Sequence, residues 1–424
     1  MPFDVTRVPR RVAVIGGGIS GMAAAHFLHP SETVTLYESE PRLGGHARTV
    51  LAGRSGERPV DTGFIVFNYA TYPHLGRLFK ELDVPVARSD MSFGVSMDGG
   101  RIEYALRSLP ALFAQPLNAA RPGFLRMLRD IQRFNTAAEA MVEDDPTIGD
   151  LVGTLGLGDW FRHYYLVPIC GAIWSTPESE IEAFPARILL RFFRNHGLLG
   201  LTGQHQWWTV EGGSREYVRR LASDLEAGGV RIVTGAPVAR VVRDGDGVTV
   251  HVPGRPAERY DEVVLACHAD QALRLLERPT AAETAALGAI RYRSNAAVLH
   301  RDPRQMPRRR ACWSSWVYRA EGERTNPGIG VTYWMNRLQN IPDDDPLFVT
   351  LNAGDAIPDE MVYDRTSFDH PVFDHAAIRA QDALAALQGA NGTWFAGAYL
   401  RHGFHEDGIA SAMRVARRMR VTVR

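Results

Sequence analysis

The sequence predicts an α/β fold in which a parallel, nucleotide-binding sheet carries an inserted domain of mixed α+β structure. Two patterns predict this class. The chain opens with an apolar strand, a glycine-rich turn, a helix and a second strand, and short apolar strands return after a long helical stretch. The length of 424 residues exceeds one ordinary core and allows two or three modules.

Composition excludes several classes of protein. The 48 Lys and Arg residues balance 48 Asp and Glu residues, so the general attraction to phosphate that nucleic-acid binding needs is missing. No run approaches about 18 apolar residues, so we expect no transmembrane segment and only peripheral membrane contact. Cys170, Cys267 and Cys312 lie far apart without C-x-x-C spacing, which favours a cytoplasmic protein without disulfides.

The elements can be predicted in chain order. The list comprises a strand at 12–15, a helix around 23–28, a strand at 34–38, amphipathic helices between 72 and 200, a β-meander at 230–251, strands at 262–266 and 393–398, a turn at 403–408 and a helix at 409–419. The first domain is therefore expected to comprise residues 1–70, 209–275 and 390–424. The inserted substrate domain then comprises residues 71–208 and 276–389.

The turn after the first strand carries the glycine spacing of a dinucleotide-binding site. Gly16 permits the turn, Gly18 lets the backbone approach a pyrophosphate, and Gly21 lets the helix pack on the strand. The N-terminus of the helix attracts phosphate. Glu38 ends the second strand, where its carboxylate can accept hydrogen bonds from ribose hydroxyls.

The residues that follow Glu38 extend this pattern. Arg42, Gly44, Gly45 and His46 complete a stretch that resembles the flavin-containing amine oxidase superfamily. The segments 60–68, 88–96, 207–214 and 402–408 resemble a bacterial subgroup of predicted NAD/FAD-binding proteins that is associated with fatty-acid modification. The resemblance implies a Rossmann-like FAD-binding domain of the p-hydroxybenzoate hydroxylase/amine oxidase type. It also implies FAD, bound noncovalently because no cysteine follows Cys312.

The resemblance assigns FAD contacts along the whole chain. Val238 corresponds to the strand that holds the adenine, and the start of the last helix corresponds to the segment at the pyrimidine end of the flavin. The expected FAD-binding residues are Gly16, Gly18, Ile19, Ser20, Gly21, Glu38, Ser39, Arg42, Gly44, Gly45, His46, Thr62, Gly63, Val238, Gly397, Asp407, Gly408 and Ile409.

Candidate acid–base groups lie in two places. His46 stands where the family commonly has Arg, and His405 and Glu406 lie in the turn expected to face the flavin. Each has a plainer interpretation: His46 as a neutral hydrogen-bonding group, and Glu406 as a favourable carboxylate at a helix N-terminus. His402 and His405 lie in a predicted turn without a complementary pair, so no metal site is expected there.

Lysine content bears on the chemistry. Oxygen-using members of the superfamily commonly place a Lys near the flavin, whereas Lys80 is the only lysine here and falls on the polar side of a predicted helix. We therefore expect slow reaction of the reduced flavin with oxygen and an electron acceptor that the sequence does not identify.

The predicted reaction follows from the apolar composition of the middle of the chain. We expect hydride transfer at flavin N5 that dehydrogenates or isomerises a C–C bond of a fatty-acyl or other lipid-like substrate. The aromatic residues expected at the substrate are Trp174, Phe192, Trp208 and Tyr399. Two alternatives stay open: an amine or amino-acid oxidase with an aromatic cage, and a flavoprotein with a structural or partner-binding role.

Overall fold

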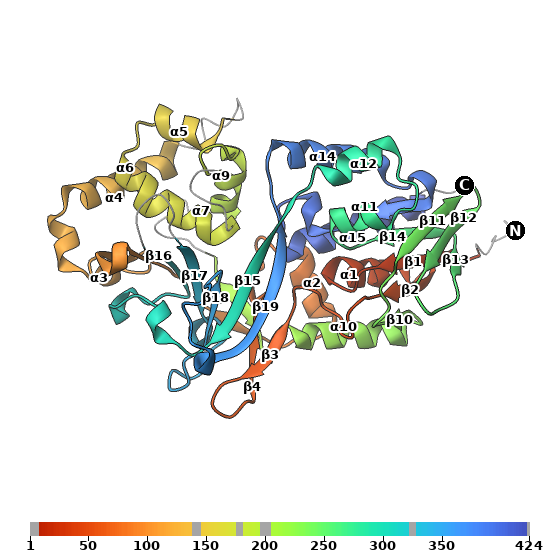
Figure 1. Ribbon diagram of the computed structural model, residues 1–424, viewed down its shortest axis with the longest axis horizontal. Coiled ribbons are helices and arrows are strands. Elements are labelled where there is room, and N and C mark those ends of the chain that lie inside the picture. The colour runs from red at the N-terminus through yellow and green to blue at the C-terminus, as the bar shows by residue number, and fades with distance from the viewer. Residues whose placement is uncertain (1–7, 138–145, 175–180, 196–204, 322–327, 422–424) are drawn as a thin grey trace, which may run out of the picture.

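The computed structural model describes residues 8–137, 146–174, 181–195, 205–321 and 328–421. Figure 1 shows a lobe around the parallel sheet on the right and a lobe of helices on the left, with the long strands β15 (Tyr292–His300) and β19 (Val362–Pro371) running between them. Within the described residues, no helix is both long enough and apolar enough to cross a membrane.

The nucleotide-binding sheet has five parallel strands in the order β10-β2-β1-β14-β20. Their bounds are Arg11–Ile15 (β1), Thr33–Tyr37 (β2), Arg231–Val233 (β10), Glu262–Leu265 (β14) and Thr393–Phe395 (β20). Strands from the beginning, the middle and the end of the chain thus lie side by side, so their carboxyl ends share one edge. That edge is where open parallel sheets bind ligands.

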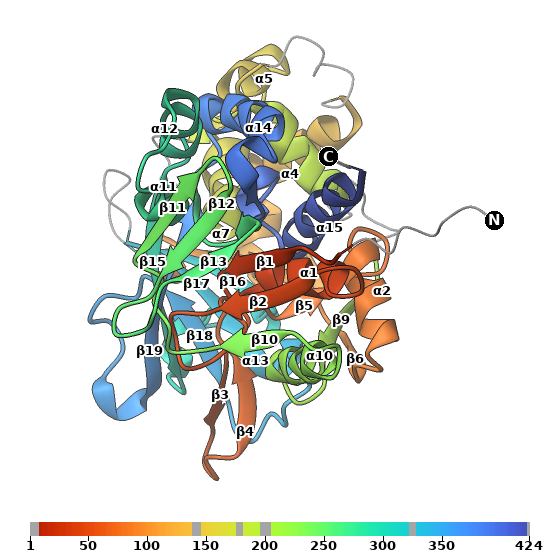
Figure 2. The ribbon, with the colours of Figure 1, turned by 90° about the vertical axis from the view of Figure 1, so that its right-hand side faces the viewer.

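The two faces of this sheet are covered differently, as Figure 2 shows. Val12 and Val14 of β1 pack with helices α1 (Ile19–Leu28) and α15 (His405–Val421), whereas Ala13 and Ile15 point to the opposite face. There they meet an antiparallel sheet of β11 (Arg240–Asp244), β12 (Gly247–His251) and β13 (Glu258–Tyr260). Alternation along one short strand therefore builds two separate cores.

The structure corrects two expectations about this lobe. The predicted meander is split, because β10 joins the parallel sheet while β11, β12 and β13 form a sheet of their own. Helices α12 (Ala281–Gly288) and α14 (His375–Leu387), assigned above to the inserted domain, bury Leu287, Ala377 and Leu384 in the core of the nucleotide-binding lobe. Their apolar faces complete that core, so the two helices group with it.

The second lobe is built on a seven-stranded mixed sheet in the order β19-β15-β18-β17-β16-β7-β8. The bounds are Phe93–Met97 (β7), Ile102–Ala105 (β8), Tyr292–His300 (β15), Trp316–Glu321 (β16), Gly328–Trp334 (β17), Phe348–Leu351 (β18) and Val362–Pro371 (β19). The described helices of the outer layer are Leu109–Leu112 (α3), Pro122–Ala137 (α4), Ile148–Thr154 (α5), Asp159–Phe161 (α6), Val167–Trp174 (α7) and Ala186–Asn195 (α9). The aromatic run 160–165 belongs to this helical layer, where Phe161, Tyr164 and Tyr165 are buried core residues.

The remaining described α-helices and strands are mostly short. They are β3 (Thr49–Ala52), β4 (Arg58–Asp61), β5 (Val66–Phe67), α2 (Pro73–Glu81), β6 (Val86–Ser89), β9 (Trp207–Val210), α10 (Arg215–Ala227), α11 (Ala269–Leu275) and α13 (Met335–Leu338). Of these, α10 and α11 pack in the cores of the nucleotide-binding lobe. The carboxylate of Asp61 is buried and accepts hydrogen bonds from Ser214, Thr49 and Gln339. Its contacts hold the start of α10 against β3 and against the segment after α13.

Candidate active site

A cavity of about 610 Å³ extends along the carboxyl edge of the parallel sheet and into the space beside the seven-stranded sheet. Its lining includes residues that the sequence predicted from widely separated segments. Those that line it are Gly16, Gly18, Ile19, Ser20, Glu38, Ser39, Gly44, Gly45, His46, Thr62, Gly63, Val238, Gly397, Tyr399 and His405.

The glycines of the first turn serve different purposes. Gly16 has a φ of +110°, and a Cβ there would lie 2.8 Å from the carbonyl oxygen of Ala266. A Cβ at Gly21 would lie 1.8 Å from the carbonyl oxygen of Gly16. The fold itself therefore requires both glycines.

Gly18 differs from these two glycines. Its φ is −75°, and the nearest heavy atom to a Cβ there would be the Cα of Gly45, 4.0 Å away. Neither backbone conformation nor protein packing demands glycine at this position. The absence of a side chain at Gly18 leaves a space between the first turn of α1 and the loop that carries Gly44 and Gly45. A ligand can approach the protein backbone closely there.

The N-terminus of α1 faces the same space. Gly18 is its N-cap and offers no side chain, and the first turn contains no acidic residue. The backbone N–H groups of that turn therefore remain available to an anion, and the helix dipole favours negative charge beside them. This end of the cavity suits a pyrophosphate.

Glu38 is held rigidly at the end of β2. Its Oε2 accepts from the backbone N–H of Gly17 at 2.6 Å, and its Oε1 accepts from Ser39 Oγ at 2.9 Å and from Glu40 N at 2.8 Å. A carboxylate has about four lone-pair sites, so one site remains for a ribose hydroxyl. Together with the open space at Gly18 and the free helix N-terminus, this residue set fits FAD.

Several predicted FAD contacts do not line the cavity. Arg42 donates to the carbonyl oxygens of Gly45 (3.1 Å) and Ala47 (3.4 Å), so it holds the glycine loop in shape. Gly408 lets α15 approach Ser20 of α1, because a Cβ there would lie 2.7 Å from Ser20 Oγ. Gly21 and Ile409 likewise serve packing rather than the cavity surface.

Two acidic residues expected at the flavin have structural partners. Glu406 accepts from the backbone N–H groups of His74 (3.1 Å) and Leu75 (3.0 Å), so its carboxylate caps α2. Asp407 accepts from His402 N (3.2 Å) and Phe404 N (3.1 Å) and closes the turn before α15. Neither carboxylate lines the cavity, which removes Glu406 as an acid–base candidate.

The predicted substrate residues divide in the same way. Tyr399 lines the cavity, whereas Trp208 packs against Tyr69 outside it and its neighbour Trp207 lines the cavity instead. Alternation along β9 explains that exchange. The side chains of Trp174 and Phe192 lie outside the described part of the structure.

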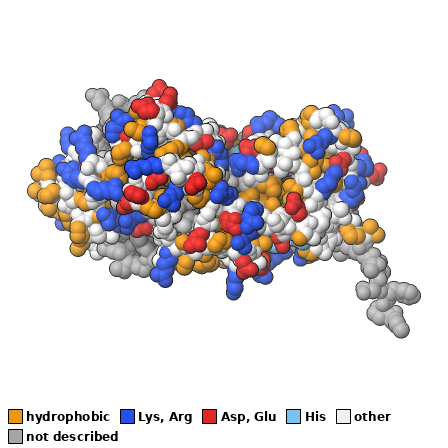
Figure 3. All heavy atoms as spheres, turned by 90° about the horizontal axis from the view of Figure 1, so that it is seen from below, with side chains coloured by type: hydrophobic (Ala, Val, Ile, Leu, Met, Phe, Trp, Pro, Cys, Tyr) orange, Lys and Arg blue, Asp and Glu red, His pale blue; other side chains and the backbone are white. Residues whose placement is uncertain are grey.

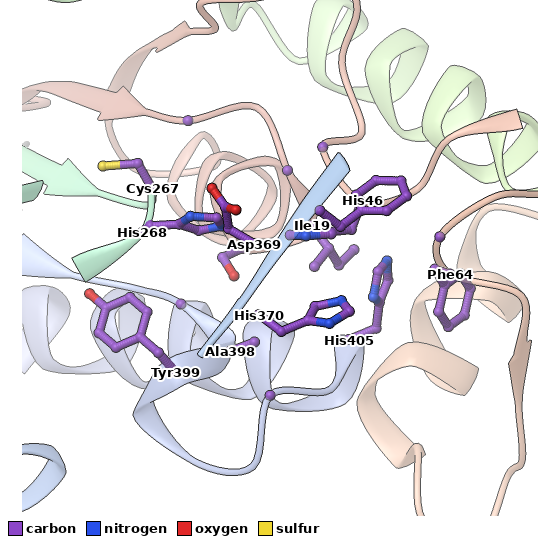
Figure 4. A pocket seen from close by; sticks show the side chains of 18 of the residues that line it. Ile19, His46, Phe64, Cys267, His268, Asp369, His370, Ala398, Tyr399 and His405 are labelled. Carbon is purple, nitrogen blue, oxygen red and sulfur yellow. The ribbon is translucent and has the colours of Figure 1, made fainter. Parts of the chain in front are cut away.

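Five of the described histidines line the cavity, and four of them, His46, His268, His370 and His405, form the cluster shown in Figure 4. The ring of His46 stacks near His268 and His370, with centroids 5.8 Å and 5.7 Å apart, while His405 stacks on Phe64 at 3.9 Å. Burial and the neighbouring histidines together lower the pKa of His46 to about 3, and burial lowers the pKa of His405 to about 3. Burial also lowers the pKa of His268 and of His370. The cluster is therefore neutral at pH 7.

A chain of amides fixes the tautomer of His370. The backbone N–H of Ala296 donates to Asn352 Oδ1 (3.0 Å), so the amide nitrogen of Asn352 must face Asn295 Oδ1 (3.0 Å). The amide nitrogen of Asn295 then faces His370 Nδ1 at 3.1 Å. Because an amide nitrogen only donates, neutral His370 carries its proton on Nε2.

His268 and His370 could not be predicted as neighbours of His46 from the sequence. His268 follows β14 and His370 lies on β19, about 100 residues later in the chain. The packing of the two lobes against each other brings these histidines together. Lys80, by contrast, is exposed on α2 and does not line the cavity.

Removing the carboxylate of Glu38 should weaken FAD binding. We expect Glu38→Ala to lower FAD affinity by about 1.5–3 kcal/mol, the range for hydrogen bonds to a charged group. Equilibrium dialysis of deflavinated protein measures this. Glu40→Ala is the matched control, because the side chain of Glu40 does not line the cavity; equal affinities of wild type and Glu38→Ala would show that Glu38 does not bind the ribose.

Replacing Asn295 by Asp should change the protonation of His370. A carboxylate beside Nδ1 stabilises the imidazolium, so the pKa of His370 should rise above that in the wild type. ¹⁵N NMR of histidine-labelled protein reports both the pKa and the tautomer. A wild-type His370 signal with the proton on Nδ1 would contradict the amide chain.

Comparisons with known proteins agree with this geometry. Residues 19–367 match the model of the family described as flavin-containing amine oxidoreductase. Coproporphyrinogen III oxidase of Mycobacterium tuberculosis (strain ATCC 25618 / H37Rv) is 27% identical over 187 residues, which is 41% of this chain and 39% of that protein. The match thus spans about two fifths of that relative.

Two solved structures share the fold over nearly the whole chain. One is a CLA-producing fatty acid isomerase from P. acnes, with a TM-score of 0.70, 14% identity and coverage of 96% of this chain and 98% of the other. The other is cyclohexylamine oxidase from Brevibacterium oxydans IH-35A, with a TM-score of 0.66, 17% identity and coverage of 97% and 99%. These structures show the fold, and the match over residues 19–367 shows that the chain belongs to the flavin-containing amine oxidoreductases, a family of flavin-dependent oxidoreductases, with FAD as its cofactor.

Proposed function

We propose that this protein uses FAD to dehydrogenate or isomerise a C–C bond of a fatty-acyl or similarly lipid-like substrate. The main support is the lining of the cavity beyond the cofactor cradle, which we define as the space bounded by Gly18, Gly44, Gly45 and Glu38. Beside the seven-stranded sheet the lining is apolar and aromatic, and consists of Ile65, Met91, Trp207, Trp316, Tyr333, Leu351 and Phe368. Such a surface stabilises hydrocarbon by removing it from water.

Charge in the cavity argues in the same direction. Glu38 and Asp369 are the acidic side chains among the described lining residues. Glu38 lies at the cofactor cradle, where it accepts a hydrogen bond from the backbone N–H of Gly17. Asp369 lies beside His268 (Figure 4). An alkylammonium substrate in the apolar end would therefore meet no carboxylate, and an unpaired buried charge is costly.

Two polar groups can orient a substrate at this end. Trp316 lines the cavity, and its buried Nε1 has no hydrogen-bond partner among the described residues, so it can donate to a carboxylate or carbonyl oxygen. His370 presents its protonated Nε2, because its Nδ1 is occupied by Asn295. When bound, FAD supplies the hydride acceptor, and the aromatic walls exclude water from the reacting carbon.

The exterior supports a lipid-like substrate as well. Four partly exposed leucines lie on or beside α3, η2 (Pro116–Ala120) and α4: Leu106, Leu109, Leu117 and Leu125. This end of the molecule is on the left in Figure 3, where orange side chains stand next to blue ones. Apolar side chains bordered by arginines suit peripheral contact with an anionic lipid surface.

Direct analysis of bound molecules and products tests the proposal. Holoprotein should co-purify with, or bind, a fatty acyl chain, and linoleic acid incubated with it anaerobically should give a desaturated or double-bond-shifted product by gas chromatography–mass spectrometry. Trp316→Phe removes the N–H but keeps an aromatic ring, and should weaken fatty-acid binding about tenfold. Flavin bleaching by cyclohexylamine, with no fatty-acid binding or turnover, would instead establish an amine oxidase.

A further inference from the structure

A second group of titratable side chains lies at the opposite end of α1 from the FAD cradle. His26 and His29 are in the last turn and at the C-cap of α1, and Asp224 is on α10. The ten residues of α1 place this group about 15 Å from the first turn of the helix. None of the three residues lines the cavity.

The three side chains converge. His26 Nδ1 lies 3.0 Å from Asp224 Oδ2, and one ligand atom from each of His26, His29 and Asp224 falls within 4.8 Å of the others. Tetrahedral zinc with bonds of about 2.0–2.1 Å separates its ligand atoms by about 3.3 Å. The His26–Asp224 pair is already near that spacing, and a side-chain rotation of His29 closes the remainder.

Each ring also has a polar neighbour outside the cluster. His26 Nε2 lies 3.9 Å from Glu81 Oε2, and the His29 ring interacts with the backbone carbonyl of Gly228. A Cβ at Gly228 would lie 2.5 Å from His29 Nδ1, so glycine permits this approach. Metal-binding histidines usually donate their second N–H to a carboxylate or carbonyl, and Glu81 and Gly228 place such groups near these rings.

The electrostatics also favour a cation. The partial negative charge at the C-terminus of α1 faces the cluster, and Asp224 and Glu81 add carboxylates from α10 and α2. Imidazole and carboxylate groups are ligands that zinc prefers in proteins.

We propose that His26, His29 and Asp224 bind one divalent transition-metal ion of the zinc type, with Glu81 and the Gly228 carbonyl as outer partners. Bound there, the ion clamps α1 to α10. It would stabilise the nucleotide-binding lobe from the side opposite the cofactor and takes no part in the flavin reaction.

Zinc chloride added to FAD-loaded protein is the probe. Competition against a chromogenic chelator at pH 7.5 should give one zinc ion per chain, and zinc should raise the melting temperature. His29→Ala and Asp224→Asn should each lower zinc affinity by at least about tenfold while the FAD content stays unchanged.

Control variants keep the result specific. His251→Ala removes a partly exposed histidine on β12, and His370→Gln removes a cavity histidine; both should retain stoichiometric zinc. X-ray absorption of the zinc complex should show two imidazole ligands. Absence of competitive zinc binding by the wild type, or equal zinc binding by wild type, His29→Ala and Asp224→Asn, would overturn the proposal.

Discussion

The site depends on one close approach of backbone to backbone. Gly18, at the start of α1, forms an isolated parallel bridge with Gly44, and its Cα faces Gly45 with open space where a side chain would project. Arg42 and the left-handed conformations of Gly44 and Gly45 hold the second loop in that position. We infer that the phosphate end of FAD lies beside these backbones, in the open space at Gly18, which would fix the direction in which the rest of the cofactor extends.

From that cradle the cavity runs toward the second lobe, and its character changes along the way. Backbone donors and Glu38 serve a charged, polar ligand at one end, whereas aromatic rings and aliphatic side chains form the other. Between them lies a cluster of histidines that burial keeps neutral. A neutral polar middle and an apolar end support the proposed hydride transfer from a carbon chain, because the described residues of the apolar end offer no carboxylate to an amine.

Local sequence predicted what local structure determines. The turn glycines, Glu38 and the opening strand–helix–strand unit could be identified because their spacing is set within a few tens of residues. The partners of Glu406 and Asp407 could not be predicted, because spacing does not reveal them: Glu406 caps α2, more than 300 residues earlier in the chain. The tautomer of His370 could not be predicted for the same reason. It depends on Asn295 of β15 and on Asn352, which follows β18. The prediction named Trp208 at the cavity, whereas its neighbour Trp207 lines it. Because side chains alternate along a strand, a shift of one residue moves the predicted contact to the opposite face.

Gly18→Ala tests the central claim most directly. The φ of −75° accepts alanine, and a Cβ would touch no protein atom closer than 4.0 Å, so the unfolding free energy of the cofactor-free protein should not fall. FAD affinity should nevertheless drop more than about tenfold, or about 1.4 kcal/mol, because the methyl group occupies the space of the ligand. Denaturant unfolding measures the stability, and flavin titration measures the FAD affinity. We predict an unchanged unfolding free energy and a lowered FAD affinity. Undiminished FAD affinity in a folded Gly18→Ala protein would contradict the account, because the cradle would then not be where FAD binds.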